Sequence, residues 1–205
     1  IIFTSDNGGL WPDATTNLPV RQGKGSIYEG GTRVPAILKF PGRIAPGSLS
    51  DEPVITIDFF PTILEVAGVP VPQMLANKMD GLSLVPLMKN ARYGRLNREA
   101  LFWHYPHYHM YGGIPYSAVR MGDWKLVQRH DGVLPELYHL SEDIHEDNNL
   151  ALVEPFRTAA MLKRLKDWRT SVGAQMPSAN PDYDPGQPTG WKRPDSFREQ
   201  AATRF

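Results

Sequence analysis

The chain has 205 residues, 41% hydrophobic and 21% charged, so it is large enough for one globular domain or for two lobes with a sizeable core. Lys plus Arg and Asp plus Glu both number 22, and this formal net charge of zero argues against a general nucleic-acid or membrane-surface binder. No apolar stretch approaches the roughly 20 residues that span a bilayer, and the lack of cysteine excludes disulfides and thiolate metal sites. Any anion site must therefore be a local feature.

The first forty residues read as two strands that flank a polar loop. Ile1 to Thr4 are predicted to form a buried strand, and Val34 to Phe40 a second strand that Pro41 and Gly42 close. A buried strand of this kind normally lies in a parallel sheet. We therefore expect its neighbours to come from sequence upstream of Ile1, and the chain to be a fragment of a longer protein.

An amphipathic helix is predicted next. Apolar residues recur at helical spacing at Phe60, Ile63, Leu64 and Ala67. Thr56 or Asp58 is expected to cap its start, and Gly68 to end it. Together with the two strands, this helix indicates the end of an α/β domain, and residues 69–89 read as a connection across its surface.

After Glu99 the pattern changes to short strands separated by turn residues. The predicted strands are Ala100–His104, Tyr116–Met121, Trp124–Arg129 and Glu136–His139. A helix that opens at Pro155 and stops at Gly173 carries one apolar stripe and is expected to cover one face of a small antiparallel sheet. This second lobe is therefore predicted to be α+β, and the Pro-rich segment beyond Gln175 to be a tail.

Asp6 and Asn7 follow the first strand, at the kind of strand end where α/β proteins place functional groups. Both side chains offer oxygen, which suits calcium or magnesium better than zinc. On these letters alone, Asp-Asn-Gly-Gly reads more readily as a simple turn.

Lys24 lies between two glycines on the loop that leads to the second strand. A lysine beside a divalent ion is a suitable receptor for a tetrahedral oxyanion, because both neutralise charge on its oxygens. A solvated loop lysine is the alternative. Glu29 and Arg33 are expected to form a structural ion pair that fixes the loop.

Five segments occur in an order that carries a family resemblance: TSDNG, GKGSIYEGGTRVP, DFFPTILEVAG, VRMGDWKLV and ELYHL. In this order the chain resembles the C-terminal part of formylglycine-dependent (type I) sulfatases of the alkaline-phosphatase superfamily, such as arylsulfatases and N-acetylgalactosamine-6-sulfatases. The resemblance implies the C-terminal portion of an alkaline-phosphatase-like α/β sandwich plus a small α+β subdomain with an antiparallel sheet and one long helix. Residues 1–90 would end the catalytic domain, 91–175 would form the subdomain and 176–205 the Pro-rich tail.

The resemblance also assigns roles. Asp6 and Asn7 look like two of the calcium ligands, and Lys24 looks like the lysine that contacts the sulfate and the leaving-group side. The other ligands, the helper residues and the Cys-type or Ser-type signature that yields formylglycine lie upstream in the family, and none occurs in this chain. We therefore expect a parent enzyme that hydrolyses sulfate monoesters of carbohydrates, with its nucleophile upstream of this chain, and we expect the chain alone to be inactive.

The segment FWHYPHYHMY clusters His104, His107 and His109 among aromatic rings. Such a composition can stack on a sugar and hydrogen-bond its hydroxyls or a second sulfate. The competing interpretation makes the aromatic residues strand core and the histidines loop surface. The family resemblance favours substrate contacts for His104 and His107.

Neither a zinc site at the three histidines nor a second calcium site is predicted. The three histidines lack the spacing and the fourth ligand of a zinc site. Asp143, Glu146 and Asp147 lack the ligand spacing of a calcium loop and are expected to serve in turns and at the start of a helix.

Two other functions remain open. The first is a phosphatase, phosphodiesterase or phosphonate hydrolase of the same superfamily, whose members typically carry Asp-His-Gly where this chain has Asp6 and Asn7; the oxygen of Asn7 favours calcium and hence a sulfatase. The second is a non-catalytic carbohydrate-binding module. By resemblance the parent enzyme is expected in the periplasm, outside the cell or in the lysosome, and any signal peptide is expected to lie upstream of Ile1.

Overall fold

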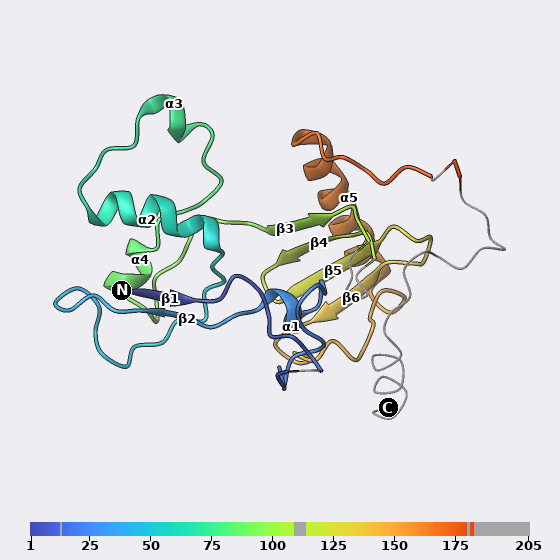
Figure 1. Cartoon of the computed structure of the whole chain (residues 1–205), viewed down its shortest axis with the longest axis horizontal. Coiled ribbons are helices and arrows are strands. Elements are labelled where there is room, and N and C mark those ends of the chain that lie inside the picture. Colours follow the sequence, from blue (N-terminus) through green and yellow to red (C-terminus); the bar gives the residue numbers. More distant parts are fainter. Residues whose placement is uncertain (13, 109–113, 180, 183–205) are drawn as a thin grey trace. The chain divides into compact units, whose positions relative to one another are not determined.

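In the computed structural model, residues 1–12, 14–108, 114–179 and 181–182 are described, and they form two compact units. The first unit contains Ile1–Asp6 and Pro35–Arg98, and the second contains Asn7–Val34 and the residues from Glu99 onward. The mixed α/β fold class is confirmed (Figure 1). Within the described ranges, no helix combines the length and apolar character needed to cross a bilayer.

The first unit is built on a short antiparallel ribbon of β1 (Ile2–Thr4) and β2 (Ala36–Leu38). The predicted second strand, 34–40, is shorter than expected, because Pro35 lacks a backbone N–H and Gly42 turns the chain with a φ of +77°. Within the ribbon Phe3 lies opposite Ile37, and these side chains are 59% and 58% exposed. β1 is thus exposed in this chain, and its burial by strands from upstream sequence stays a prediction.

Helices complete the first unit. The 3-10 turn η1 (Thr56–Asp58) runs into α2 (Phe59–Val66), and α3 (Gln73–Ala76) and α4 (Val85–Lys89) lie within the predicted connection. The predicted helix and its stop at Gly68, with a φ of +68°, are confirmed. Leu84, Leu87 and Leu96 form the core beneath them.

Asp58 is fully buried and does not cap α2. Its carboxylate instead accepts hydrogen bonds from the backbone N–H groups of Ile55 and Leu82, each at 2.9 Å, and pairs with both terminal nitrogens of Arg98. One carboxylate therefore ties the start of α2 to two later segments of the same unit.

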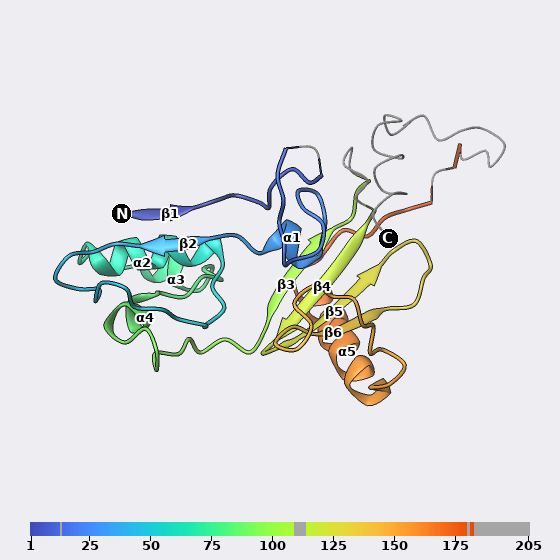
Figure 2. The same cartoon turned by 90° about the horizontal axis from the view of Figure 1, so that it is seen from below.

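The second unit is a four-stranded antiparallel sheet in the order β3-β4-β5-β6, with α5 (Pro155–Ser171) on one face. Its strands are β3 (Leu101–Tyr105), β4 (Tyr116–Met121), β5 (Trp124–Arg129) and β6 (Glu136–His139). Strands, order of elements and covering helix agree with the predicted α+β lobe. Figure 2 shows α5 and the short helix α1 (Glu29–Thr32) on opposite sides of this sheet.

Alternation along the strands supplies a core on each face. Val119, Leu126 and Leu137 point to α5 and pack with Met161 and Leu165. The residues one position along, Ala118, Val127 and Tyr138, pack on the other face with Ile27 and Tyr28 from the segment before α1. Both faces of the sheet are thus covered, which explains why the middle of each of β4, β5 and β6 is almost fully buried.

The two compact units are not the segments into which the sequence was divided. Residues 7–34 pack with the second unit, although the sequence places them in a segment 1–90. The reason is the burial of Ile27 and Tyr28 on the sheet. The division of the parent enzyme at residues 90 and 175 stays a prediction, and most of the predicted tail, 183–205, lies outside the described residues.

Candidate functional site

The loop after β1 and the loop that carries Lys24 lie side by side in the second unit. The backbone N–H of Lys24 donates to the carbonyl of Gly9 at 3.0 Å, and the N–H of Gly8 donates to the carbonyl of Gly31 at 3.0 Å. Asn17 adds two side-chain hydrogen bonds, to the carbonyls of Gly9 and Gln22. The structure therefore brings the segment that begins with Asn7 against the segment that carries Lys24.

Glycine is required for this close approach. A Cβ atom added to Gly8 would lie 1.7 Å from the carbonyl oxygen of Gly30, and one added to Gly30 would lie 2.2 Å from that of Gln22. Both obstacles are backbone atoms, which cannot move aside as a flexible side chain can. Glycine at these positions therefore sets the contact between the two loops.

The predicted site side chains differ in exposure. Lys24 and Asp6 are exposed, and Asn7 is half-buried. In the described part of the chain, no cluster of three or more His, Cys, Asp or Glu side chains could hold a metal ion. The assignment of Asp6 and Asn7 as metal ligands therefore stays a prediction.

A buried ion cluster lies beneath the Lys24 loop. Lys125 of β5 is fully buried, and its Nζ lies 2.8 Å from Glu29 Oε1 and 3.0 Å from Glu146 Oε1. Glu146 is also fully buried, and its Oε2 accepts a hydrogen bond from the Glu29 N–H at 2.6 Å. Arg33 and Arg120 add positive charge, 3.4 and 3.9 Å from Glu29 Oε2. The expected Glu29–Arg33 pair exists, but it is the exposed edge of a larger cluster.

The two carboxylates of the cluster have opposite pKa shifts. Burial raises the pKa of Glu146 above its ordinary value, and the opposing effect of Lys125 does not offset this. Burial also acts to raise the pKa of Glu29, but Lys125, Arg120 and Arg33 together lower it. The charged form of Glu29 is therefore favoured, whereas burial disfavours the charged form of Glu146.

Arg21 and Tyr28, on either side of Lys24 in the sequence, are anchored as well. The Nη1 of Arg21 donates to the carbonyl oxygen of Glu146 at 2.9 Å, and its guanidinium lies 4.0 Å from the centre of the Tyr28 ring. The Tyr28 hydroxyl donates to Glu136 Oε2 at 2.7 Å; burial and then this hydrogen bond raise the pKa of Tyr28. The loop from Arg21 to Glu29 is thus held at both ends.

His104 belongs to a different cluster, centred on the buried hydroxyl of Ser117. The Ser117 Oγ lies 2.8 Å from His104 Nδ1, 2.9 Å from His130 Nε2 and 3.1 Å from Arg169 Nη1. His104 Nε2 lies 2.6 Å from the Gln175 carbonyl, which can only accept, so this nitrogen carries a proton. Both ring nitrogens of His104 therefore have protein partners.

The structure does not bring His104 and the Lys24 loop to one face of the sheet. Ser117 and His104 are paired across β3 and β4 on the side of Arg169 and α5, while Ile27 and Tyr28 cover the opposite side. His107 is exposed, and its ring lies edge-on to Tyr105 at 5.4 Å between centroids. His109 lies outside the described residues. Substrate contacts of His104 and His107 stay predictions.

The sequence interpretation missed Lys125 and Glu146 as buried partners. The sequence places Lys125 in a predicted strand and Glu146 in a turn or at a helix start, and it predicts neither as a buried charge, because charged residues usually face solvent. One signal was present: Lys125 shares the inward face of β5 with Val127, two residues along. Glu146 gives none, since its positive φ of +58° is visible only in the structure.

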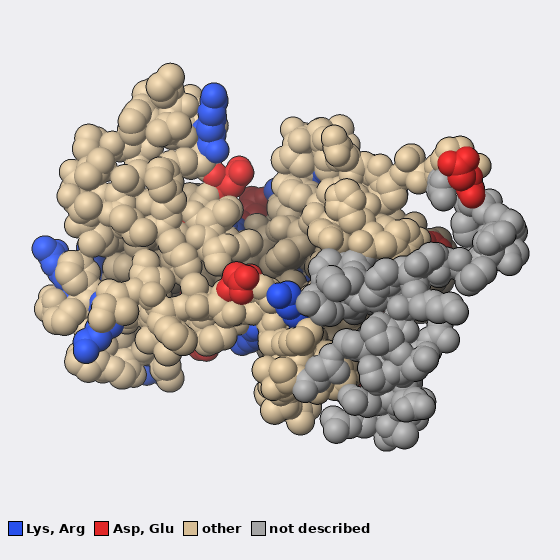
Figure 3. All heavy atoms as spheres, viewed as in Figure 1, with Lys and Arg blue, Asp and Glu red and all other residues tan. Residues whose placement is uncertain are grey.

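Figure 3 shows the charged side chains on one face of the molecule. On the face drawn in Figure 3, the Lys and Arg side chains of the described residues lie scattered and form no continuous basic surface. The expectation from net charge that the chain is no general nucleic-acid binder stays a prediction.

Comparisons with known proteins place the chain in a family. Residues 22–171 match the family model described as "N-sulphoglucosamine sulphohydrolase, C-terminal". A sulfatase of Formosa agariphila is 41% identical over 161 residues, which cover 76% of this chain and 29% of the relative. Human arylsulfatase A is 38% identical over 130 residues, which cover 61% of this chain and 24% of the relative. The chain thus spans about a quarter to a third of these relatives.

Solved structures agree. The crystal structure of Ps i-CgsB, also known in complex with k-i-k-neocarrahexaose, has a TM-score of 0.72 and 25% identity, covering all of this chain (100%) and 41% of the other. The structure of BT4656 in complex with its substrate D-glucosamine-2-N,6-O-disulfate has a TM-score of 0.62 and 27% identity, covering 74% of this chain and 31% of the other. The chain belongs to the sulfatase family and matches its C-terminal part.

Proposed function

We propose that this chain is the C-terminal part of an enzyme that hydrolyses sulfate monoesters, and that Lys24 contacts the sulfate. The observation that carries the proposal is the placement of Lys24: its backbone is bonded to Gly9, directly after Asp6-Asn7-Gly8, in a chain that belongs to the sulfatase family. An ammonium group at this position neutralises charge on sulfate oxygens and stabilises the charge that develops as the ester bond breaks. Its three donors act as a compact point charge that tolerates several ester geometries.

The nucleophile of the proposed reaction lies outside this chain. A formylglycine residue, formed from a Cys or Ser signature, would supply the oxygen that attacks sulfur, and the chain has neither a cysteine nor that signature. The 205 residues alone are therefore proposed to be inactive.

Asp6 and Asn7 are proposed to hold calcium. Their donor set fits, because one carboxylate and one amide oxygen suit a hard cation, while nitrogen and sulfur donors are absent from the pair. The described residues provide no third acidic or histidine ligand in a cluster with them. Calcium would add positive charge beside the sulfate, and the residues of this chain would share in holding it.

Sulfated carbohydrates are the proposed substrates. Two relatives in structure are known with carbohydrate ligands, the neocarrahexaose of Ps i-CgsB and the disulfated glucosamine of BT4656. In this chain His107 is the more available of the two predicted substrate histidines, since it is exposed, whereas both nitrogens of His104 are bonded within the protein.

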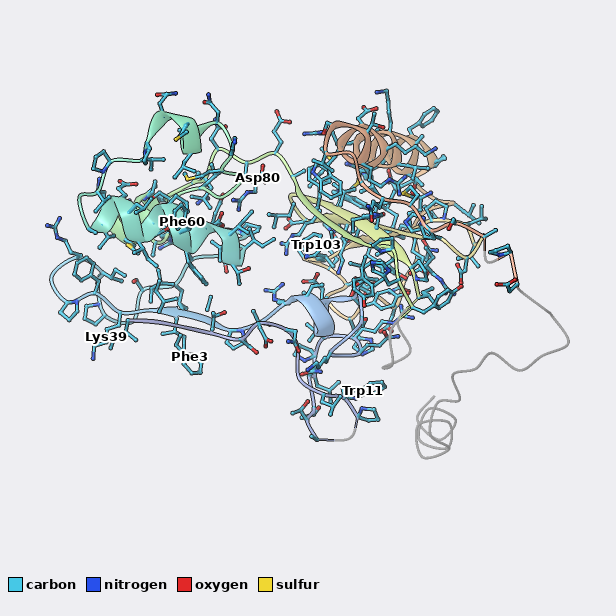
Figure 4. The ribbon with its side chains drawn as sticks, turned by 45° about the horizontal axis from the view of Figure 1, so that its top comes forward. Phe3, Trp11, Lys39, Phe60, Asp80 and Trp103 are labelled. Atoms are coloured by element: carbon cyan, nitrogen blue, oxygen red, sulfur yellow. The ribbon has the colours of Figure 1, made fainter. Side chains whose placement is uncertain are left out.

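The partner of the first unit is proposed to be the remainder of the same enzyme. β1, β2 and α2 expose apolar side chains, of which Figure 4 marks Phe3 and Phe60, 59% and 52% exposed. Ile37 and Ile63 are similarly exposed, at 58% and 54%. An apolar surface of this extent needs a cover, and the relatives are three to four times longer than the matched segment.

Two other functions are weighed against the sulfatase. A phosphatase or phosphonate hydrolase would share the oxyanion site, but Asn7 supplies oxygen where a transition metal favours imidazole. A non-catalytic carbohydrate-binding module would keep the aromatic and histidine residues of β3 without the chemistry. An exported or lysosomal location is proposed from the family alone.

The test uses the full-length parent enzyme, co-expressed with a formylglycine-generating enzyme. We expect it to release sulfate from a chromogenic aryl sulfate much faster than it releases phosphate from the matching aryl phosphate. Chelation of calcium and Asp6→Ala should each abolish most of the release. Preference for the phosphate would identify the phosphatase, and sugar binding without release of either anion would identify the binding module.

A further inference from the structure

Glu146 contacts both ends of the loop that carries Lys24. Its backbone carbonyl accepts a hydrogen bond from Arg21 at 2.9 Å, and its side chain accepts one from the N–H of Glu29 at 2.6 Å. Lys24 lies between these two residues in the sequence, and its own side chain is exposed. One residue, distant in the chain, therefore closes the loop at its base.

The backbone of Glu146 has an unfavourable conformation that the surrounding contacts must stabilise. Its φ of +58° lies in the left-handed region, which is unfavourable for a residue with a Cβ atom. The side chain is fully buried, and its Oε1 lies 3.0 Å from Lys125 Nζ. Such a conformation persists where the surrounding contacts determine it, and here those contacts are Arg21, Glu29 and Lys125.

Lys125 supplies the charge that makes a buried Glu146 tolerable. Its fully buried ammonium lies between Glu29 and Glu146 and contacts both carboxylates. Arg120, opposite Lys125 on the neighbouring strand, lies 3.9 Å from Glu29. The sheet, covered on its other face by α5, thus acts as a rigid base for the loop.

We infer that Glu146 and Lys125 are positioning residues for Lys24. They fix the base of the loop from Arg21 to Glu29, so that the exposed ammonium of Lys24 is presented in one place. This inference rests on the proposed function for its effect on catalysis, because Lys24 is there the group that contacts sulfate. Neither Glu146 nor Lys125 touches substrate.

The first test compares activity in the full-length parent enzyme, for Glu146→Ala, Lys24→Ala and the double variant. Glu146→Ala should lower kcat/KM for an aryl sulfate about 10- to 100-fold, since displacing a catalytic group by about 1 Å costs up to that much. The double variant should be no slower than Lys24→Ala alone, because both changes act on the same group. Losses that multiply, or a Glu146→Ala enzyme as fast as the parent, would overturn the inference.

Two further variants serve as controls in case Glu146→Ala fails to fold. Arg21→Met removes the hydrogen bond to the Glu146 carbonyl but leaves the buried carboxylates and the Lys125 ammonium unchanged, and it should reproduce a loss in kcat/KM if Glu146→Ala fails to fold. Lys163→Met removes an exposed lysine paired with Asp167, with the two side chains 76% and 54% exposed, and should leave activity unchanged. An Arg21→Met enzyme with unchanged kcat/KM would contradict the role assigned to the loop anchors.

The second test does not depend on activity. Amide hydrogen exchange of this chain should show faster exchange at Lys24, whose N–H is bonded to Gly9 rather than to Glu146, when Glu146 is replaced by alanine. Amides of β4 and β5 should keep their protection. If the parent enzyme releases no sulfate, the proposed function fails while exchange at Lys24 still decides the positioning; unchanged exchange at Lys24 would refute it.

Discussion

Replacing Asp58 tests whether buried charge holds the first unit together. Asp58 is fully buried and joins three partners: the N–H groups of Ile55 and Leu82 and the guanidinium of Arg98, which is itself only 11% exposed. Asp58→Ala would leave a nearly buried Arg98 without its partner and two backbone donors unsatisfied. Breaking a buried pair costs about 3–5 kcal/mol. The free energy lost with the two N–H hydrogen bonds is not added to this value, because the same carboxylate makes all these contacts. The expected loss in the free energy of unfolding is therefore about 4 kcal/mol.

The assay is urea denaturation of the chain followed by circular dichroism, with hydrogen exchange at the Leu82 amide as a local probe. Asp167→Asn is the matched control, because its ion pair with Lys163 is exposed and worth only about 0.3–0.5 kcal/mol. Asp58→Asn should fall between the two, since its amide oxygen can still accept one N–H but carries no charge for Arg98. A loss for Asp58→Ala below about 1 kcal/mol would refute the reasoning. A buried carboxylate with three partners would then contribute no more to the free energy of unfolding than an exposed ion pair.

Three further predictions concern the second unit. Gly8→Ala should lower the free energy of unfolding by more than about 2 kcal/mol, because its Cβ would meet the Gly30 carbonyl at 1.7 Å; a thermal melt indistinguishable from the parent would show that the loops can separate freely. Leu165→Ala should cost about 2–5 kcal/mol through the cavity left under α5, measured by urea denaturation. Burial, and next Arg169, lower the pKa of His130 below its ordinary 6.5. The free energy of unfolding should therefore increase as pH rises from the folded pKa to 6.5, and this stability should be lost as pH falls through the folded pKa. His130→Asn should remove this part of the pH profile, and an unchanged profile would exclude His130 as its source.

The second lobe was predicted well because its signals are local. Turn residues such as Gly122, with a φ of +58°, separate strands whose apolar residues alternate, and Gly173 ends the long helix with a φ of +61°. Each of these features depends on a few neighbouring residues. The antiparallel sheet and its covering helix could therefore be derived from the sequence.

The packing of the candidate site was harder to predict because it depends on residues far apart in the chain. Glu146 and Lys125 hold the loop of Lys24 from a different part of the sequence, and neither carries a local signal for burial beyond the strand position of Lys125. The sequence predicts only that Asn7 and Lys24 lie on one polar loop between two strands. That these residues pack with the second unit rather than the first could not be read from periodicity.

The central claim, that Lys24 serves a sulfatase, is tested most directly by one steady-state comparison in the full-length enzyme. We predict that Lys24→Ala lowers kcat for an aryl sulfate about 10²- to 10³-fold, the effect of removing one group that stabilises transition-state charge, while Lys166→Ala, an exposed lysine on α5, changes nothing. A Lys24→Ala enzyme that releases sulfate as fast as the parent would contradict the account.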